Sequence, residues 1–404
     1  MSHPAPHPGS EALPCFDHQP RTRVVFGADS IDRAGELARE LGAKKVLLVT
    51  DPGIVAAGHA DHLFENLEAA GLRVTTFGRA RENPTTRCVA SCLAVARRVR
   101  PDTIVGLGGG SAMDTAKGCN FLLTNGGRMQ DYQGVGKARK PMLPFIAIPT
   151  TAGTGSECQS AALIVDERTH QKMACLDPKV AAKIAILDPK LTLSQPPRVT
   201  ACAGMDAIAH ALETAVTTRS NPLSRMYSRE AFKLCAKAFA EVVTHPKDLE
   251  ARGRMLLGAA LAGLAIENSM LGAAHAAANP LTAHFGIVHG QAVGLMLPHV
   301  IRFNARQSEL SKVYSELAVV AGLTTPAHDH SSETLVSHLE ALLDLAHLPR
   351  RLSGHRADRK MIPLMAEEAA RQWTATFNPR PVSKENFAEL YEAAFAAEKV
   401  PKAE

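Results

Sequence analysis

The first half of the chain alternates between two sequence patterns, and this alternation constrains the fold more than any other feature. Short apolar runs that end in a polar or glycine turn predict buried strands, and segments with apolar residues at helical spacing predict helices between them. The predicted strands are residues 22–27, 44–51, 72–78, 102–110 and 143–151. The predicted helices are residues 32–42, which Ser30 can cap and Gly42 ends, 60–71, 85–100 and 111–124. Strands that alternate with helices in this way form a mostly parallel sheet covered by helices.

The sequence changes character after Leu187, where Asp-Pro and Gln-Pro-Pro segments interrupt the chain. From Ala201 onward nearly every segment is rich in Ala and Leu at helical spacing, which predicts an all-helical second part. We expect an α/β domain over 21–195 and an all-helical domain over 196–404. Residues 1–20 are polar and Pro-rich, and we expect a flexible arm there.

Composition excludes several classes of protein. At 404 residues the chain exceeds one typical core, and its 46% apolar and 21% charged residues are ordinary for a globular protein. The net charge of +5 is spread along the chain, so no nucleic-acid partner is expected. No apolar run of membrane-spanning length and no signal peptide are found, so no membrane partner is expected either. The eight scattered cysteines, without a CxxC pair, indicate a reduced, cytoplasmic protein.

A glycine-rich segment follows the predicted strand 102–110 and opens the next helix. It contains Gly108, Gly109, Gly110, Ser111 and Asp114. Glycines at such a turn let backbone N–H groups approach a pyrophosphate, and the start of a helix adds a favourable partial positive charge. A tight strand-to-helix turn without a ligand is the alternative interpretation.

Two further strand ends carry polar residues suited to a dinucleotide. Thr150 and Thr151 end the strand 143–151 and Thr154 follows it, and Asp51 ends the strand 44–51. Ligands of open α/β sheets bind at the carboxyl ends of strands, so these positions favour one dinucleotide site. A carboxylate at Asp51 can accept a hydrogen bond from a ribose 2′-hydroxyl and would repel a 2′-phosphate, which favours NAD over NADP. Asp51 can also cap a helix, and the two roles are compatible.

Four residues in the second half have the chemistry of a metal site. Asp206 and His210 are one helical turn apart, and His275 and His289 come from two different local elements. Three imidazoles and one carboxylate suit Fe²⁺ or Zn²⁺ and contain too much nitrogen for Mg²⁺ or Ca²⁺. The chain has 17 His, so an ordinary structural role is the alternative for each one.

These residues together resemble the iron-containing (group III) alcohol dehydrogenase family over nearly the whole chain. The motifs that carry the resemblance are FG at 26–27, VTD at 49–51, NPT at 83–85, GGGSxxDxAK at 108–117, PTTAGTGSE at 149–157, ILDP at 186–189, GxDAxxHAxE at 204–213, the His segment 275–289, LPHVIRFN at 297–304 and NPRP at 378–381. The resemblance implies a dehydroquinate synthase-like architecture, with an α/β dinucleotide-binding domain followed by an all-helical domain.

The resemblance also implies roles for individual residues. The four candidate ligands fall on the family's metal-binding positions, and both polar loops fall on its cofactor loops. Leu187 falls where the family packs a residue near the nicotinamide, and Asp51 falls on the position associated with NAD preference. Lys172 aligns loosely with a basic position near the cofactor.

One position departs from the family pattern. Many members have a His assigned to proton transfer four residues after the third metal ligand, and this chain has Asn279 there. An amide cannot act as a general base at neutral pH. Three readings remain: His284 takes over the proton relay, the proton leaves through the ribose hydroxyls and solvent, or Asn279 binds an altered substrate. We favour the last two together.

The expected function is reversible hydride transfer between a small alcohol and NAD, giving an aldehyde or ketone, in a homodimer or larger homo-oligomer. An alternative is a hydroxyacid–oxoacid transhydrogenase or maleylacetate reductase type, which would need an Arg or Lys for its acidic substrate. A lyase of the dehydroquinate synthase type is disfavoured because residues 271–290 contain no Lys or Arg. A binding protein without activity would rest on Asn279 alone.

Overall fold

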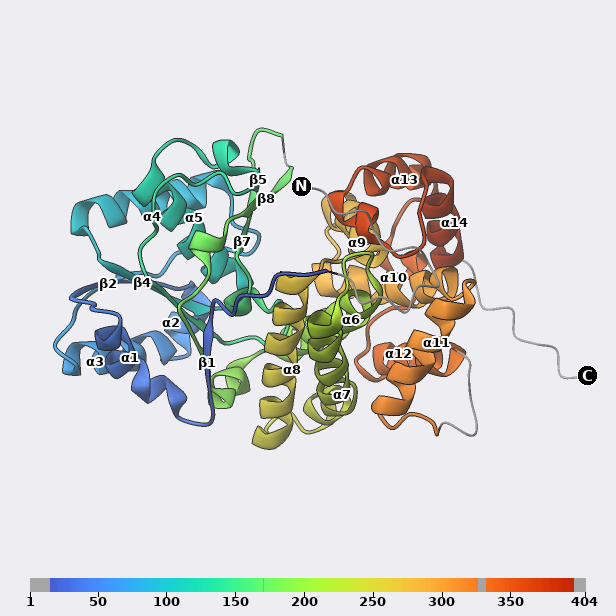
Figure 1. The fold of residues 1–404 in the computed structure, drawn as a ribbon, viewed down its shortest axis with the longest axis horizontal. Coiled ribbons are helices and arrows are strands. Elements are labelled where there is room, and N and C mark those ends of the chain that lie inside the picture. Colours follow the sequence, from blue (N-terminus) through green and yellow to red (C-terminus); the bar gives the residue numbers. More distant parts are fainter. Residues whose placement is uncertain (1–14, 170, 326–331, 396–404) are drawn as a thin grey trace, which may run out of the picture. The chain divides into compact units, whose positions relative to one another are not determined.

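The computed structural model describes residues 15–169, 171–325 and 332–395 (Figure 1). The chain divides into two compact units. The α/β unit comprises residues 17–196 together with 247–267, and the helical unit comprises the chain before residue 17, residues 197–246 and the chain from residue 268 onward. Residues 15–20 form no helix or strand, and the rest of the predicted arm lies outside the described residues.

A six-stranded sheet in which every pairing is parallel forms the centre of the α/β unit. The strand order is β1-β9-β6-β4-β2-β3. The strands are β1 (Arg23–Phe26), β2 (Lys45–Val49), β3 (Arg73–Phe77), β4 (Thr103–Gly108), β6 (Phe145–Pro149) and β9 (Ile184–Leu187). The predicted mostly parallel sheet is therefore confirmed.

Both faces of this sheet are covered, which explains why its strands are continuous apolar runs. Leu47 and Val49 of β2 belong to one buried cluster, and Val46 and Leu48 belong to another, because successive strand residues point to opposite faces. The first cluster includes residues of α4 and α5, and the second includes residues of α1 and α3. The helices of this part are α1 (Ala34–Glu40), α2 (Pro52–Ala56), α3 (His59–Ala69), α4 (Thr86–Val99) and α5 (Gly110–Asn125).

The start of the first predicted helix differs from the expectation. Ser30 lies inside a 3₁₀ turn, Ser30–Arg33, that precedes α1, and its hydroxyl is buried without a hydrogen-bond partner among the described residues. The residue that caps this turn is Asp29, whose backbone is left-handed with a φ of 62°. Ser30 is therefore not the N-cap. The predicted end is confirmed, since Gly42 has a φ of 81° just after the helix.

A second, three-stranded sheet was not anticipated. It consists of β5 (Gly134–Val135), β8 (Lys172–Leu176) and β7 (Ala161–Val165), in that order. Strands β7 and β8 are antiparallel, and β7 follows directly on the segment that contains Thr154 and Ser156. A short 3₁₀ turn, Ser156–Cys158, connects that segment to β7. The small sheet thus continues the second predicted cofactor loop.

Helix α8 (Leu249–Asn268) belongs to the α/β unit up to Glu267, although its sequence lies within the predicted helical domain. A Cβ atom added to Gly155 would lie 2.6 Å from Cα of Gly263, so backbone meets backbone there. Glu267 accepts hydrogen bonds from the backbone N–H of Ser160 at 2.8 Å and from its hydroxyl at 2.6 Å. The boundary near residue 195 remains our proposal for the two domains, with α8 as the element that departs from it.

The helical unit contains no strand among its described residues, as the sequence predicts for this part of the chain. Its helices are α6 (Pro197–Val216), α7 (Pro222–Thr244), α9 (Ala273–Phe285), α10 (His289–Asn304), α11 (Ser308–Val320), α12 (Ser332–Leu345), α13 (Ile362–Ala370) and α14 (Lys384–Phe395). Alanines fill much of its core, and α6 is buried along most of its length. Such small side chains let helix backbones approach closely: a Cβ on Gly290 of α10 would overlap the carbonyl of Cys202 in α6.

Across the described part of the chain no single helix is long and apolar enough to span a membrane, and only the bent pair α8 and α9 passes that test together, by length and composition alone.

Candidate functional site

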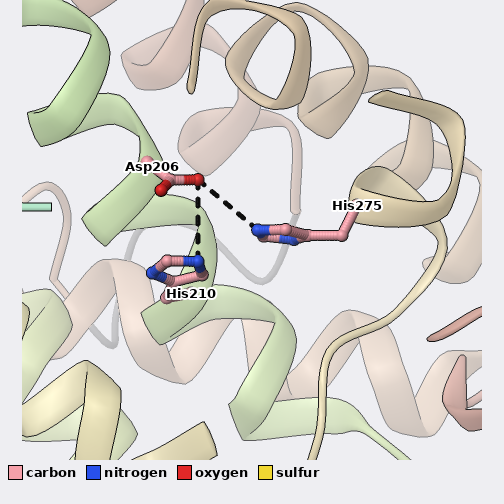
Figure 2. A group of neighbouring side chains, drawn as sticks. All are labelled: Asp206, His210 and His275. Carbon is pink, nitrogen blue, oxygen red and sulfur yellow. Dashed lines mark ion pairs between the residues drawn. The ribbon is translucent and has the colours of Figure 1, made fainter. Parts of the chain in front are cut away.

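Three elements of the helical unit bring the four predicted metal ligands together. Asp206 and His210 lie one turn apart on α6, His275 lies in the first turn of α9, and His289 begins α10. Oδ1 of Asp206 lies 3.6 Å from Nε2 of His210, 3.4 Å from Nε2 of His275 and 3.9 Å from Nε2 of His289. Figure 2 shows the rings of His210 and His275 facing the Asp206 carboxylate, with a dashed line from one of its oxygens to each ring. Residues 69 positions apart in sequence, Asp206 and His275, thus face each other directly.

The residues present fit a divalent cation. Each of Asp206, His210 and His275 offers a ligand atom, and these atoms lie within 4.8 Å of one another. Oδ1 of Asp206 and Nε2 of His275 are buried and have no hydrogen-bond partner among the described residues. Leaving such atoms unsatisfied is costly, and a cation bound between them would satisfy both. His289 is less buried, with 28% of its side chain exposed, and it stands at the edge of this group.

Electrostatics favours an ionised Asp206. Burial by itself raises the pKa of this carboxyl, but the positive charges of His210, His289 and His275 and the contact with His275 hold the pKa well below its usual range. The imidazoles are packed tightly: the rings of His210 and His275 stack with centroids 4.8 Å apart, and those of His275 and His289 lie 5.5 Å apart. An anionic carboxylate surrounded by ring nitrogens is the donor set that Fe²⁺ and Zn²⁺ accept.

Glu213 supports His275 and was not singled out from the sequence. Its carboxylate accepts a hydrogen bond from Nδ1 of His275 at 2.6 Å, from the N–H of Ala274 at 2.7 Å and from the N–H of Gly272 at 3.1 Å. The bond to Nδ1 fixes the ring so that Nε2 faces Asp206, a common arrangement behind metal-binding histidines. Glu213 lies two turns after Asp206 on α6, so helical spacing could have identified it.

Burial and charge shift the pKa values of His275 and Glu213 in opposite directions. Burial lowers the pKa of His275, while the carboxylates of Glu213 and Asp206 raise it more strongly, to about 9. Burial raises the pKa of Glu213, but the charge of His275 and the hydrogen bonds it accepts bring the net pKa below its usual value. Glu213 is therefore ionised, and its negative charge makes the His275 imidazole a stronger ligand for a metal ion.

We expect Glu213→Gln to weaken metal binding by about 10- to 100-fold, because an amide holds the imidazole less firmly and carries no charge. The measurement is the dissociation constant for Zn²⁺ or Fe²⁺, determined by competition with a chelator. Glu230→Gln is the matched control, since Glu230 is an exposed residue of α7 paired with Lys233. An affinity within about twofold of wild type in Glu213→Gln would contradict this role.

Asn279 and His284 both lie on α9, beyond His275. Asn279 is half-buried one turn after His275, and its Nδ2 donates a hydrogen bond to Oε1 of Gln372 at 3.0 Å. Nε2 of His284 lies 2.7 Å from Oε2 of Glu368 on α13. The ring of His284 is thus engaged by a carboxylate, and Asn279 shares the face of α9 that carries His275.

The polar residues predicted to bind a dinucleotide meet at one edge of the six-stranded sheet. Strands β2, β4 and β6 are neighbours, and the segments after their carboxyl ends carry Asp51, the glycines and the threonines. The N–H of Thr150 donates to the carbonyl of Gly108 at 3.1 Å. Asp51 caps α2, with Oδ1 accepting from the N–H groups of Gly53 and Ile54 at 2.9 and 3.2 Å.

Glycines are required at this edge of the sheet because neighbouring side chains lie too close to leave room for a Cβ atom. Gly108 has a φ of 144°, and a Cβ there would lie 2.9 Å from Cβ of Ala112 and 3.1 Å from Oδ2 of Asp51. A Cβ on Gly110 would lie 2.9 Å from the side chain of Thr154. The backbone at the start of α5 is therefore bare, as a pyrophosphate bound through N–H groups requires.

The remaining predicted cofactor residues differ in exposure. Ser111 accepts a hydrogen bond through Oγ from the N–H of Asn83 at 3.3 Å, and Thr151 lies beside Gly109. Asp114 is buried and accepts from the hydroxyl of Ser156 at 3.2 Å. Leu187 is fully buried at the end of β9, and Lys172 is exposed at the start of β8. Thr150, at 2% exposure, is buried like Asp114 and Leu187, so these three are core side chains behind the loops.

Two family models match consecutive parts of the chain. The model described as iron-containing alcohol dehydrogenase matches residues 20–189, and the model of the C-terminal part of the Fe-containing alcohol dehydrogenase family matches residues 200–395. Alcohol dehydrogenase 4 of Schizosaccharomyces pombe is 33% identical over 370 residues, which cover 92% of this chain and 87% of the relative. The NAD-dependent methanol dehydrogenase of Bacillus methanolicus is 32% identical over 369 residues, which cover 91% of this chain and 96% of the relative.

A solved structure has the same fold. The crystal structure of 1,3-propanediol oxidoreductase superimposes with a TM-score of 0.91 at 31% identity, covering 95% of this chain and 100% of the other. The chain therefore belongs to the iron-containing alcohol dehydrogenase family, and it is an oxidoreductase that acts on alcohols. The resemblance and the fold class inferred from the sequence are confirmed.

Proposed function

We propose that this protein is a metal-dependent, NAD-linked dehydrogenase that interconverts a small alcohol with its aldehyde or ketone. The observation that carries the proposal is the buried group of Asp206, His210 and His275, with His289 beside it and Glu213 behind it. A divalent ion held there supplies Lewis acidity toward the substrate oxygen, and NAD supplies the hydride acceptor. The family is iron-containing, so we propose Fe²⁺, with Zn²⁺ as the other ion these ligands suit.

NAD is the proposed dinucleotide. The glycine segment Gly108–Gly110 with Ser111 would hold the pyrophosphate at the start of α5, and Thr151 and Thr154 would contact it from the neighbouring strand end, whereas the side chain of Thr150 is buried behind that loop. A carboxylate at Asp51 would accept from the ribose 2′-hydroxyl and repel a 2′-phosphate. We assign Asp114 and Leu187 to positioning from the core, because both side chains are buried.

Asn279 is proposed to bind substrate, because its amide cannot accept a proton from an alcohol at neutral pH. Its Nδ2 is bonded to Gln372, so the amide is oriented and presents Oδ1 as an acceptor for a hydroxyl. The proton released on oxidation would then leave through the ribose hydroxyls and solvent. The comparisons favour alcohols over oxo acids as substrates, since the relatives described above are named for alcohol dehydrogenation.

Two alanine variants separate binding from proton transfer. Asn279→Ala is expected to raise KM for the alcohol by about tenfold, the value of one lost hydrogen bond, with kcat changed less. His284→Ala is expected to keep kcat within about threefold, because its ring is already paired with Glu368. Steady-state kinetics with saturating NAD⁺ distinguish the two. A fall in kcat of about 100-fold or more in His284→Ala would assign the relay to His284 instead.

The deciding experiment is metal analysis of protein purified without added metal, with NADH oxidation assayed against short aldehydes, ketones and 2-oxoacids. About one metal ion per chain, with turnover abolished by a chelator and restored by Fe²⁺ or Zn²⁺, is the expected result. Protein that binds neither ion would refute the metal assignment. Turnover of 2-oxoacids alone would move the function to the oxo-acid type.

Two further proposals concern the surroundings of the enzyme. None of the eight cysteines, all of which lie among the described residues, forms a disulfide, in keeping with a reducing compartment such as the cytoplasm.

We also propose a homodimer or larger homo-oligomer. Sedimentation equilibrium tests this, and a monomer at micromolar concentration would exclude it.

A further inference from the structure

The most unusual group of side chains outside the metal site surrounds Lys117, inside the α/β unit. Lys117 lies on α5, two turns after Gly110, and its side chain is completely buried. Burying a charged ammonium is expensive unless it is paired and fully hydrogen-bonded, so such a residue needs a structural or functional reason.

The hydrogen bonds of the Lys117 ammonium go to one segment, residues 156–161. Its Nζ donates to the carbonyl of Ser156 at 2.6 Å, the hydroxyl of Ser156 at 3.0 Å, the carbonyl of Gln159 at 2.8 Å and the carbonyl of Ala161 at 2.9 Å. These acceptors lie between Thr154 and the first residue of β7. An ammonium has three N–H donors, so four acceptors use its full capacity.

The same segment is tied to α5 by a second residue. The hydroxyl of Ser156 donates to Asp114, which lies one turn before Lys117 on the same face of α5. Within the segment, Nε2 of Gln159 donates to the carbonyl of Thr154 at 2.7 Å, and the N–H of Ser156 donates to the hydroxyl of Thr154 at 3.3 Å. A short chain of hydrogen bonds therefore runs from Lys117 to Thr154.

We propose that Lys117 is a positioning residue that holds the loop containing Thr151 and Thr154 against the glycine loop at the start of α5, so that both loops present one preformed surface to the dinucleotide. A Cβ on Gly110 would lie only 2.9 Å from the side chain of Thr154, so a shift of either loop changes their shared surface. The role assigned to Lys117 rests on the proposed function, because only that proposal places NAD on these loops.

The acidic residues near Lys117 explain why its charge is tolerated. Burial lowers the pKa of the Lys117 ammonium, and the carboxyls of Asp114, Glu157 and Glu267 oppose this in part, so that the net pKa stays below its ordinary value. Burial in turn raises the pKa of Asp114 to about 6 and that of Glu157 to about 7. Both carboxylate oxygens of Glu157 are buried without a hydrogen-bond partner among the described residues. Glu157 therefore contributes charge compensation and no bond to the loop.

This difference between Lys117 and Glu157 provides the test. Lys117→Met keeps the apolar stem and removes all four bonds, whereas Glu157→Gln removes a charge and leaves those bonds in place. Because Lys117→Met alone leaves nearby carboxyls without their cation, the double variant Lys117→Met/Glu157→Gln is included to limit loss of folding. Lys140→Met is the matched control, since Lys140 is exposed.

The readouts are the NADH dissociation constant from fluorescence titration, metal content, and hydrogen exchange of residues 150–161. In Lys117→Met and the double variant we expect the dissociation constant to rise by about tenfold or more, the value of hydrogen bonds to a charged group. Metal content should equal that of wild type, and amides of the segment should exchange faster. Glu157→Gln and Lys140→Met should stay within about twofold of wild type in NADH affinity.

Three results would overturn the proposal. If the folded double variant bound NADH with an affinity within about twofold of wild type, Lys117 would be a buried structural residue without a role in positioning the cofactor loops. An equal loss of affinity in Glu157→Gln would assign the effect to the charge cluster. Wild-type protein that does not bind NADH would refute the cofactor assignment itself, and hydrogen exchange would still show separately whether Lys117 holds the loop.

Discussion

Replacing His275 with alanine is expected to leave a folded protein that binds NADH and contains no tightly held metal. The substitution removes one of three buried groups whose ligand atoms lie within 4.8 Å of one another. It also leaves Glu213 without the imidazole that it orients. Because a metal ion acting as Lewis acid contributes several kcal/mol to catalysis, turnover should fall by about 1,000-fold or more. Metal analysis, NADH fluorescence and steady-state kinetics measure the three quantities.

His245→Ala is the matched control for this variant. His245 is an exposed residue that follows α7 in the helical unit, so its loss should change neither metal content nor turnover. If His275→Ala retained one metal ion per chain together with metal-dependent turnover, the assignment of His275 as a ligand would be wrong. A simultaneous loss of metal and of folding would be recognised by circular dichroism, and His275→Gln would then be measured in its place.

The second large effect is expected at the glycine turn. Gly108→Ala should raise the NADH dissociation constant by about tenfold or more, because the backbone there has a φ of 144° and the added methyl would lie 2.9 Å from Ala112 and 3.1 Å from Asp51. Both contacts belong to the proposed dinucleotide loops, so relief of the overlap must move one of them. The strained backbone should also lower stability by about 1–3 kcal/mol.

Gly42→Ala separates strain from binding. Gly42 also has a positive φ, 81°, but a Cβ there meets no atom within 4 Å, and the residue precedes β2 at the opposite edge of the sheet. We therefore expect this control to lower the melting temperature and leave NADH affinity unchanged. Equal NADH affinity in Gly108→Ala and wild type would show that the glycine turn does not contact the cofactor.

The sequence predicted those parts of the fold in which local pattern and tertiary environment agree. The strands β2, β4 and β6 are buried on both faces, so their residues are continuously apolar and easy to recognise. The small sheet was missed although β7 reads AALIV, a short apolar run; β5 has only two residues, too few for a pattern, and no local signal pairs the three segments. Ser30 was assigned as a cap because serine commonly caps helices, whereas the left-handed Asp29 starts the turn.

The same division applies to the candidate site. Asp206 and His210 are visible as a pair because helical spacing alone brings them together. Their meeting with His275 and His289 followed from the family resemblance, since no local pattern relates α6 to α9 and α10. The bond from Lys117 to Ser156 depends on tertiary packing and leaves no local signal, whereas Glu213 shares a helical face with Asp206, and spacing alone could have indicated it.

The position of α8 has a consequence for the order in which the molecule can form during synthesis. All six strands of the parallel sheet lie before residue 190, yet the glycine that packs against Gly155 and the carboxylate that binds Ser160 belong to α8. A nascent chain therefore exposes the strands and both loops to the cell before the ribosome has made the helix that completes their unit. Domain-by-domain folding from the N-terminus is interrupted in this protein, and its α/β unit becomes complete only after Glu267 has left the ribosome.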